Sequence, residues 1–291
     1  MKKFILILFA LTILFWGCST NSTGPTGTGD LTMLLTDAPL DSSNVSDVMV
    51  KFKEIRINKS GDNTSFTTFK EYGEPEGIFN LMNLQDGLTG ELGTKEMDAG
   101  VYSHMRIIFD ENYNHHITID GTQYPLDLTY SDDGGNFPTG HLELAGSFRI
   151  DDGIETRLVL DFDARKSIVK KATGDYKLHP AIRLISEDTT GASDVQLNNI
   201  PSDADHVIGY LYEEDAFDQS TETGNDFENS IVSDDPNQSD VLEFDYIEEG
   251  TYTLVIVTYD SENNIIEVYT KTIEIINGET AQKSYDFSSW S

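Results

Sequence analysis

Apolar and polar residues alternate with a period of two along most of the chain, as in β-strands that bury one face. Between Asp47 and Asn58 the side chains of Val48, Val50 and Phe52 share one face, and the apolar pattern then continues at 55 and 57. This change of parity predicts a β-bulge at Lys53-Glu54, because one extra residue restores the inward direction of the side chains that follow. No long segment has a convincing helical period, so we predict an all-β protein.

The same alternation predicts further strands in the first half of the chain, at residues 31–35, 101–109, 117–119, 142–150, 156–162 and 182–185. Asp120-Gly121 and Asp152-Gly153 each lie between two of these segments, and Asp-Gly favours the positive φ angles of a tight turn. We therefore predict a hairpin at each dipeptide. Residues 81–93 are less regular, and we expect a helical turn there.

The second half of the chain repeats this style, with predicted strands at residues 195–199, 206–212, 241–246, 251–259, 265–275 and 283–287. Residues 251–259 are apolar at both parities, which predicts a central strand buried on both faces, and Asp260–Asn264 predicts the hairpin that follows it. A glycine and a tyrosine recur at Gly100-Val-Tyr102 and Gly250-Thr-Tyr252. Short strands at this spacing predict two β-sandwich domains.

The N-terminus has the pattern of an export signal: Lys2 and Lys3 precede an apolar run of 13 residues, Phe4–Trp16, in which Thr12 alone is polar, and then Gly17-Cys18. A membrane-spanning helix needs about 20 residues, so this segment is too short to be one. The residues Phe15-Trp-Gly-Cys18 resemble the lipobox of bacterial lipoproteins, which implies cleavage before Cys18 and acylation of its thiol. Ser19 follows instead of Asp, which by the same resemblance implies sorting to the outer membrane. We predict a signal peptide at 1–17 and a flexible tether at 18–29.

Charge is distributed unevenly along the chain. Its formal net charge is −32, from 19 basic and 51 acidic residues, and from Gly191 onward only Lys271 and Lys283 oppose 23 acidic residues. This shift predicts a linker at Glu187–Ser193, with domains at 30–187 and 193–291. So acidic a surface repels nucleic acid and anionic headgroups, so we expect no nucleic-acid partner and membrane contact only through the N-terminal lipid.

Several motifs of the first domain occur in an order that resembles one known family. They are Leu34-Leu-Thr-Asp37-Ala38-Pro39, Ala99-Gly100-Val-Tyr102, Leu160-Asp-Phe162-Asp163-Ala-Arg-Lys-Ser167 and Tyr176-Lys-Leu-His-Pro180. Over about residues 30–185 the chain resembles the bacterial and archaeal family called domain of unknown function 4382. The resemblance implies an exported or lipid-anchored all-β protein, and it implies no activity, ligand or functional residue. The second domain resembles transthyretin-like or immunoglobulin-like β-sandwiches only generically.

Two kinds of acidic group are candidates for chemistry. Asp161 and Asp163 flank Phe162, so an inward Phe162 places both carboxylates on the opposite face, about 7 Å apart along the strand. Such a pair could serve acid–base catalysis or calcium, while solvated ion pairs with Arg165, Lys166 and Lys170 are the simpler interpretation. Asp132-Asp133 and Asp234-Asp235 are acidic loop clusters of the kind that supplies oxygen ligands to calcium. Calcium is the one cofactor that we consider.

Tyr124, Tyr130 and Phe137 lie in or near predicted loops and are candidates for stacking on a sugar, although such residues also cap the ends of sandwiches. His115 and His116 are adjacent, so on a strand they point to opposite faces and cannot chelate one zinc ion together. The sequence contains no nucleophile elbow, zinc-protease helix motif or phosphate loop.

These observations predict a non-catalytic outer-membrane lipoprotein with a structural or interaction role in the cell envelope. Its partner would be an envelope protein or a polysaccharide. Two alternatives remain open: a glycan-binding module for polysaccharide capture, and a hydrolase that uses Asp161 and Asp163.

Overall fold

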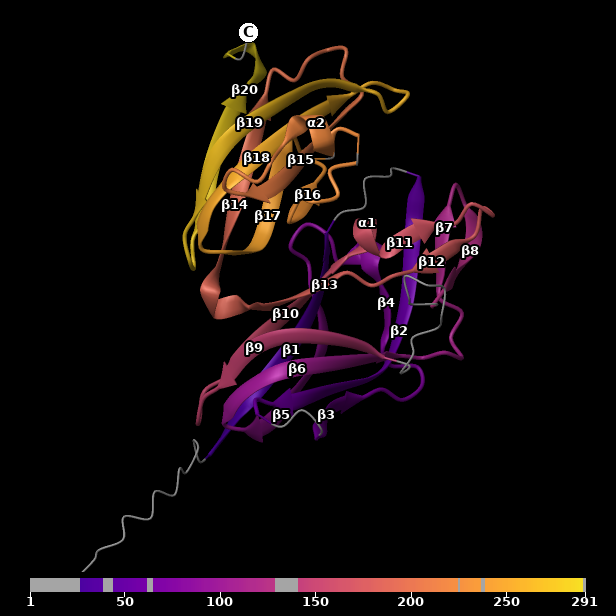
Figure 1. Ribbon diagram of the computed structural model, residues 1–291, viewed down its shortest axis with the longest axis vertical. Helices are drawn as coiled ribbons and strands as arrows, with labels where there is room; N and C mark the ends of the chain where they lie inside the picture. The colour runs from indigo at the N-terminus through magenta and orange to yellow at the C-terminus, as the bar shows by residue number, and fades with distance from the viewer. Residues whose placement is uncertain are drawn as a thin grey trace, which may run out of the picture.

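The computed structural model describes residues 27–38, 44–61, 65–128, 141–224, 226–236 and 239–289. These residues form two β-sandwich domains that follow one another along the long axis of the molecule (Figure 1). The prediction of an all-β fold is confirmed. Cys18, Asp132, Asp133, Tyr130 and Phe137 lie outside the described residues. Within the described part of the chain, no helix has the length and apolar character needed to cross a membrane.

The first domain pairs a four-stranded sheet with a nine-stranded sheet. The smaller sheet has the order β13-β10-β1-β5, with bounds β13 (Ile182–Ser186), β10 (Thr156–Asp163), β1 (Thr28–Ala38) and β5 (Gly90–Asp98). The larger sheet runs β11 (Ile168–Lys170), β12 (Tyr176–Leu178), β8 (Thr122–Asp127), β7 (His116–Ile119), β2 (Val45–Lys59), β6 (Gly100–Phe109) and β9 (Leu142–Ile150), and β3 (Phe66–Glu71) and β4 (Ile78–Asn80) also pair with β2.

The β-bulge predicted in β2 is confirmed. The register between β2 and β6 shifts between Phe52 and Glu54, and the apolar side chains on both sides of the shift are fully buried. Val50 and Phe52 before the bulge and Ile55 after it therefore reach the same core, between the two sheets. The extra residue resolves the change of parity, as the period of two requires.

One of the two predicted hairpins is confirmed and the other is wrong. Asp120 and Gly121 have φ angles of 49° and 72° and join β7 to β8, in which Ile119 pairs with Thr122. The turn at Asp152-Gly153 instead crosses from the larger sheet to the smaller one, since β9 pairs with β6 and β10 pairs with β1. A tight Asp-Gly turn reverses the chain in both cases, and only the distant partner strands decide whether its two arms pair with each other.

The predicted tether ends earlier than expected, because β1 begins at Thr28 and pairs there with Asp98. Gly29 lies against the turn that precedes β10. A Cβ atom at Gly29 would lie 2.3 Å from the backbone oxygen of Asp151 and 2.7 Å from that of Ile154. Glycine is therefore required at this position for close backbone contact, which the composition of the segment does not reveal.

The segment at 81–93 divides into a helical turn and a strand. A 3-10 helix spans Leu81–Asn83, as expected, and β5 follows as an unpredicted strand. β5 lies at the edge of the smaller sheet and buries few side chains, chiefly Leu92 and Met97. An edge strand with little apolar alternation gives little sequence pattern to detect.

The second domain packs a three-stranded sheet on a four-stranded one. The first has the order β17 (Val241–Glu248), β14 (Thr190–Asn198), β20 (Thr280–Asp286), and the second β16 (Val232–Asp234), β15 (His206–Glu213), β18 (Gly250–Tyr259), β19 (Ile265–Ile275). β18 lies between β15 and β19, so the prediction of a central strand is confirmed. One face contacts the core between the sheets, and the other packs under Phe217 and Phe227, on either side of the short helix α2 (Gln219–Glu222).

The connection between the domains is short. The predicted linker Glu187–Ser193 is instead a 3-10 turn, Glu187–Thr189, followed directly by β14 from Thr190. Asn277 in the second domain donates from its side chain to the backbone oxygen of Asp188, at 2.9 Å. The composition of this segment is typical of a loop, but its backbone forms regular secondary structure on both sides of the boundary between the domains.

In both domains, the tyrosine of the repeated glycine and tyrosine pattern makes the same hydrogen bond. The Tyr102 hydroxyl donates to the backbone oxygen of Asp98 at 2.9 Å, and the Tyr252 hydroxyl donates to that of Glu248 at 2.8 Å. Both tyrosines are buried, and each bonds the residue four positions earlier. Each hydroxyl thus fastens the start of its strand to the preceding turn, in the manner of a tyrosine corner.

Candidate functional site: the junction between the domains

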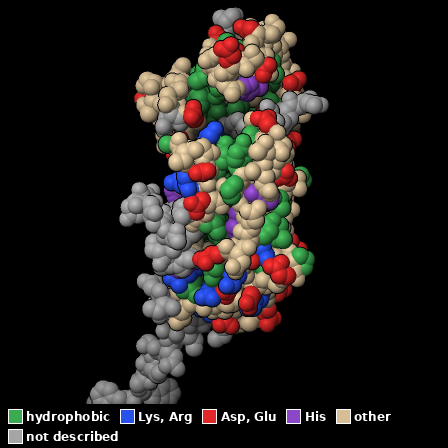
Figure 2. Space-filling view, turned by 90° about the vertical axis from the view of Figure 1, so that its right-hand side faces the viewer, with side chains coloured by type: hydrophobic (Ala, Val, Ile, Leu, Met, Phe, Trp, Pro, Cys, Tyr) green, Lys and Arg blue, Asp and Glu red, His purple; other side chains and the backbone are tan. Residues whose placement is uncertain are grey.

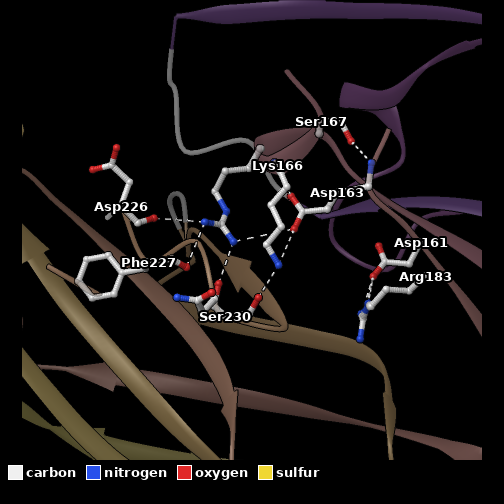
Figure 3. A network of polar contacts seen from close by, with 12 residues as sticks. Asp161, Asp163, Lys166, Ser167, Arg183, Asp226, Phe227 and Ser230 are labelled. Atoms are coloured by element: carbon white, nitrogen blue, oxygen red, sulfur yellow. Dashed lines mark hydrogen bonds and ion pairs between the residues drawn. The ribbon is translucent and has the colours of Figure 1, made fainter. Parts of the chain in front are cut away.

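A short helix of the first domain holds a loop of the second. Helix α1 (Ala164–Ser167) follows β10, and Arg165 donates to the backbone oxygens of Asp226 and Phe227 and, at 2.7 Å, to the hydroxyl of Ser230. Lys166 donates to the backbone oxygen of Ser230 (Figure 3). We call Arg165, Lys166 and the loop 226–230 the clasp. Its bonds come from charged donors, which make the stronger class of protein hydrogen bond, and those to Phe227 and Ser230 are partly buried.

The loop of the clasp is held in an uncommon backbone conformation. Asp226 and Phe227 have φ angles of 50° and 55°, a region that non-glycine residues enter at a cost of about 1–3 kcal/mol. Phe227 stacks on Tyr210 with ring centroids 4.4 Å apart. Buried Glu222 accepts hydrogen bonds from Tyr212 at 2.8 Å and from the Asn229 side chain at 2.6 Å. These contacts hold the loop so that its carbonyl groups meet Arg165.

Asp161 and Asp163 lie on this side of the first domain, and both are structural. Asp163 accepts from the backbone N–H of Lys166 at 3.0 Å, which caps α1, and pairs with the Lys166 ammonium at 3.3 Å. Asp161 pairs with Arg183, whose Nε lies 2.8 Å away (Figure 3). The expectation of solvated pairs is wrong, because Asp161 is 5% exposed and Asp163 is 6% exposed. The second domain lies over this face of the sheet, which the strand pattern alone cannot show.

Lys170, the third cation expected to pair with these carboxylates, lies elsewhere. Its ammonium is 5.7 Å from the centre of the Tyr176 ring. Tyr176 in turn packs against Tyr124, with ring centroids 5.4 Å apart, and both rings contact the core of the first domain. The part that we predicted for Tyr124 in sugar binding stays a prediction; in the structure this ring is half-buried.

An apolar contact forms the middle of the junction. Leu34, Val159 and Ile185 make a small buried cluster on the outer face of the four-stranded sheet, and Tyr246 of β17 packs against it. Apolar area removed from water stabilises the contact by roughly 25 cal/mol per Å². The outer face of this sheet is therefore an interface between the domains.

Another part of the junction, next to the clasp, is acidic. Two cavities share Asp86 of the first domain and Glu243 of the second. The smaller, of about 20 Å³, is also lined by Asp37, Asp161 and Asp245, and the larger, of about 350 Å³, by Asp234 and Asp235. None of the described residues that line these two cavities is Lys, Arg or His. We call these seven carboxylates the acidic junction.

Burial raises the pKa of several of these carboxyl groups. Burial, together with the charges of Asp86 and Asp235, raises the pKa of Asp234 to about 8. Burial also raises the pKa of Asp37 well above its usual value, with Asp161 and Asp163 adding to the effect. The pKa values of Asp86, Glu243 and Asp245 are raised too, again mainly by burial. These groups repel one another when they are ionised.

Beside the clasp lies a groove of about 620 Å³, lined among others by Lys166, Lys170, Tyr210 and Tyr259. The two tyrosine hydroxyls are 3.0 Å apart. Tyr210 stacks on Phe227, and Tyr259 stacks on His206 with ring centroids 4.8 Å apart. Each ring thus has a face covered by another ring, so the groove offers mainly polar contacts.

The two neighbouring histidines do not act together. His115 is buried and accepts from the backbone N–H of Lys51 at 3.3 Å, while His116 bonds the backbone oxygen of Asn114 at 2.8 Å. Burial lowers the pKa of His115. Among the described residues, no three His, Cys, Asp or Glu side chains are arranged to hold a metal ion.

The charge asymmetry of the sequence is visible on the surface. On the face shown in Figure 2, Lys and Arg side chains lie on the first domain and near the junction, and acidic side chains lie on both domains. The sequence pointed to Asp161, Asp163 and Asp234 as acidic groups, but not to Asp37 or Asp86. Nothing in the local pattern of those two residues indicates that a second domain faces them.

Comparisons with known proteins gave one family match and several weak structural similarities. The Bacillus anthracis TIE protein is 11% identical, with a TM-score of 0.24 over 89% of this chain and 34% of that one, so this chain spans about a third of its length. GBS52, the minor pilin of Streptococcus agalactiae, is 9% identical, with a TM-score of 0.23 over 88% of this chain and 94% of that one. A variant of the shaft pilin SpaA from Lactobacillus rhamnosus GG is 10% identical, with a TM-score of 0.25 over 90% of this chain and 97% of that one.

Similarities this weak transfer no property to the chain. No curated protein matched it. The family match covers residues 28–180, which include β1, the bulged strand β2, the Tyr102 corner, Asp161, Asp163 and the clasp residues Arg165 and Lys166. The chain belongs to the family described as Domain of unknown function (DUF4382).

Proposed function

We propose that this protein is a non-catalytic lipoprotein of the outer membrane, anchored through Cys18, that presents its second domain away from the membrane for a structural or interaction role. The observation that carries the proposal is the axial arrangement of the two domains. Strand β1, drawn in indigo, begins at the end of the first domain that is far from the second domain (Figure 1), and its first residue is Thr28. A chain held by lipid at Cys18, ten residues before Thr28, would therefore carry the second domain outermost.

The packed junction supports this role. A protein that holds a partner at a distance from a surface needs a stiff connection, because each flexible joint adds conformational freedom that binding must remove. The clasp, the Tyr246 contact and the short connection at Glu187–Thr189 all restrict movement between the domains. The two domains thus behave as one rigid unit rather than as two flexibly linked domains.

The hydrolase alternative receives no support from the carboxylates that suggested it. Asp161 and Asp163 are buried and held by Arg183 and Lys166. A catalytic pair would need to reach a substrate, with one carboxyl group able to gain and lose a proton. Glycan capture remains an alternative, with the groove beside the clasp and Tyr124 as places where a sugar could bind.

Two experiments test the proposal, one for the lipid anchor and one for the interaction role of the second domain. The full chain and Cys18→Ala are expressed in a Gram-negative host with labelled palmitate. We expect label and outer-membrane fractionation for the unchanged chain, and loss of both for Cys18→Ala. Equal fractionation of the two chains would contradict the anchor.

A photo-crosslinking residue then replaces Ser202, in the exposed turn after β14, with Glu96 on β5 as the control position. We expect a discrete protein or polysaccharide adduct from position 202 and a weaker one, or none, from position 96. Absence of adducts at position 202 in intact cells would contradict the interaction role.

A further inference from the structure

The carboxylates around the larger cavity of the acidic junction have no basic side chain beside them in the part of the lining that the structure describes. Asp161, at the smaller cavity, pairs with Arg183, but none of the described residues that line either cavity is Lys, Arg or His. Carboxylates brought together in a partly buried space repel one another unless protons or a cation neutralise them. The fold thus brings together carboxylates from both domains at a point where no described lining residue is basic.

Two buried carboxyl groups at this point each have one unsatisfied oxygen. Asp234 is 1% exposed; its Oδ2 accepts from the backbone N–H of Glu243 at 2.7 Å, and its buried Oδ1 has no hydrogen-bond partner. Asp37 is 4% exposed; its Oδ1 accepts from the backbone N–H of Ala164 at 2.9 Å, and its buried Oδ2 makes no hydrogen bond of good geometry, although the Gln85 side chain acts to lower the pKa of this group. Buried polar atoms are almost always satisfied, so these two orphaned oxygens need an explanation.

The positions of the carboxylates suit a cation at the larger cavity. Asp234 ends β16 and forms a buried wall of that cavity, while Asp86 and Glu243 are exposed at its rim, one from each domain. Asp245 lies beside the turn at Asp86-Gly87, since a Cβ atom at Gly87 would meet its carboxylate oxygen at 2.3 Å. An ion at this point would contact carboxylates of both domains.

We propose that the acidic junction binds a divalent cation between Asp86 of the first domain and Asp234 and Glu243 of the second. We assign the cation as calcium, because all of these ligands are oxygen atoms. Calcium accepts six to eight oxygens in flexible geometry, whereas magnesium demands near-ideal octahedral coordination. The side chains as they stand do not form a finished metal site within the described residues. Binding therefore draws them together, which gives the weak affinity of extracellular calcium modules, with Kd on the order of 10⁻⁴–10⁻³ M.

The inference goes beyond the proposed function, since it holds whether or not Cys18 is acylated. The bound ion would join the domains at a second point, besides the clasp, and oppose their separation. Protons provide the competing explanation, because a neutral Asp234 needs no cation.

The test is titration of Ca²⁺ alone into the full chain in detergent, after treatment with a chelator, followed by calorimetry. We expect one saturable site in the stated range and a rise in Tm on binding. Asp234→Asn should weaken binding at least about tenfold, since it removes the buried ligand charge. Asp86→Asn, at the exposed rim, should weaken binding without harming the fold, and Asp203→Asn, an exposed acid in the turn between β14 and β15, should leave it unchanged.

Three results would overturn the proposal. The first is no saturable binding up to about 10 mM Ca²⁺, which is ten times the upper end of the expected range. The second is binding that is undiminished in both Asp86→Asn and Asp234→Asn, which would place the ion elsewhere. The third is Mg²⁺ binding as tight as Ca²⁺ binding, which would contradict the assignment to calcium.

Discussion

Arg165 of the first domain donates a hydrogen bond of 2.7 Å to the hydroxyl of Ser230 in the second domain. Ser230 is buried, and the Arg165 side chain is 13% exposed, so water does not readily replace this bond. The same guanidinium also reaches two backbone oxygens of the loop. One side chain on a four-residue helix thus connects two domains that each have their own core.

Replacing Arg165 should separate the unfolding of the two domains. Arg165→Ala removes several hydrogen bonds from a charged donor, each worth about 1.5–3 kcal/mol. We expect a net loss of about 2–3 kcal/mol and a fall in Tm of roughly 4–12 °C, with the single calorimetric transition splitting into two.

Arg149→Ala is the matched control. Arg149 is 56% exposed and pairs with Asp151, two residues away, at 2.6 Å. Such a surface pair contributes at most about 1 kcal/mol, so its loss should leave one transition. If both variants lowered Tm equally, the clasp would not couple the domains.

The two tyrosine corners should contribute equally to their own domains. Tyr102→Phe and Tyr252→Phe each remove one hydroxyl that donates to a backbone oxygen. We expect each to lower the free energy of unfolding by about 1 kcal/mol, measured by urea denaturation. Tyr113→Phe is the control, because among the described contacts its hydroxyl makes no hydrogen bond. A corner variant indistinguishable from this control would show that its bond adds nothing to stability.

Stability should fall as the pH rises from 7 to 9. The pKa of Asp234 is raised to about 8 in the folded state, against an ordinary value of 3.8. A raised folded pKa gives stability that is complete below the unfolded value and is lost as the pH rises through the folded value. The buried His115, whose pKa is lowered, is neutral throughout this range and does not contribute.

Asp234→Asn reproduces the neutral form of this group. The variant should raise Tm at pH 8.5 by several degrees in the absence of calcium, and it should flatten the decline of Tm between pH 7 and pH 9. Thermal melts of both chains across this range measure the effect. A wild-type curve that rises with pH, or equal slopes for the two chains, would refute the assignment.

Gly29 should tolerate no side chain. Gly29→Ala places a Cβ atom against two backbone oxygens, which cannot move as a flexible side chain would. We expect a loss of about 1–3 kcal/mol, measured by urea denaturation. Gly73→Ala is the control, since a Cβ atom there meets nothing within 4 Å. Equal stability of the two variants would show that β1 does not need this close approach.

Local sequence patterns predicted most of the strands but did not predict which strands pair with one another. The parity change in β2 placed a bulge at Lys53, because the direction of a side chain depends only on its own strand. The Asp152-Gly153 turn was recognised, but the hairpin was wrong, because β10 pairs with β1, more than a hundred residues earlier in the chain. β5 was missed since an edge strand buries little.

The candidate site shows the same division. Asp161 and Asp163 were identified from alternation on one strand, and Lys166 was correctly named as an ion-pair partner. Their burial was not expected, because the second domain covers them. Arg165 was expected to pair with acids, whereas its main partners are backbone groups and a hydroxyl of another domain.

The sequence by itself determined that the chain is made of strands, which residues of most strands face inward, and which family the first domain resembles. These properties follow from the order of neighbouring residues, since the period of a strand is two wherever it lies. Only the tertiary structure decided which strands pair, how the domains join and which carboxylates lose contact with water. Those properties depend on contacts between residues far apart in the chain, and the free energy of an ionised group depends on everything that surrounds it.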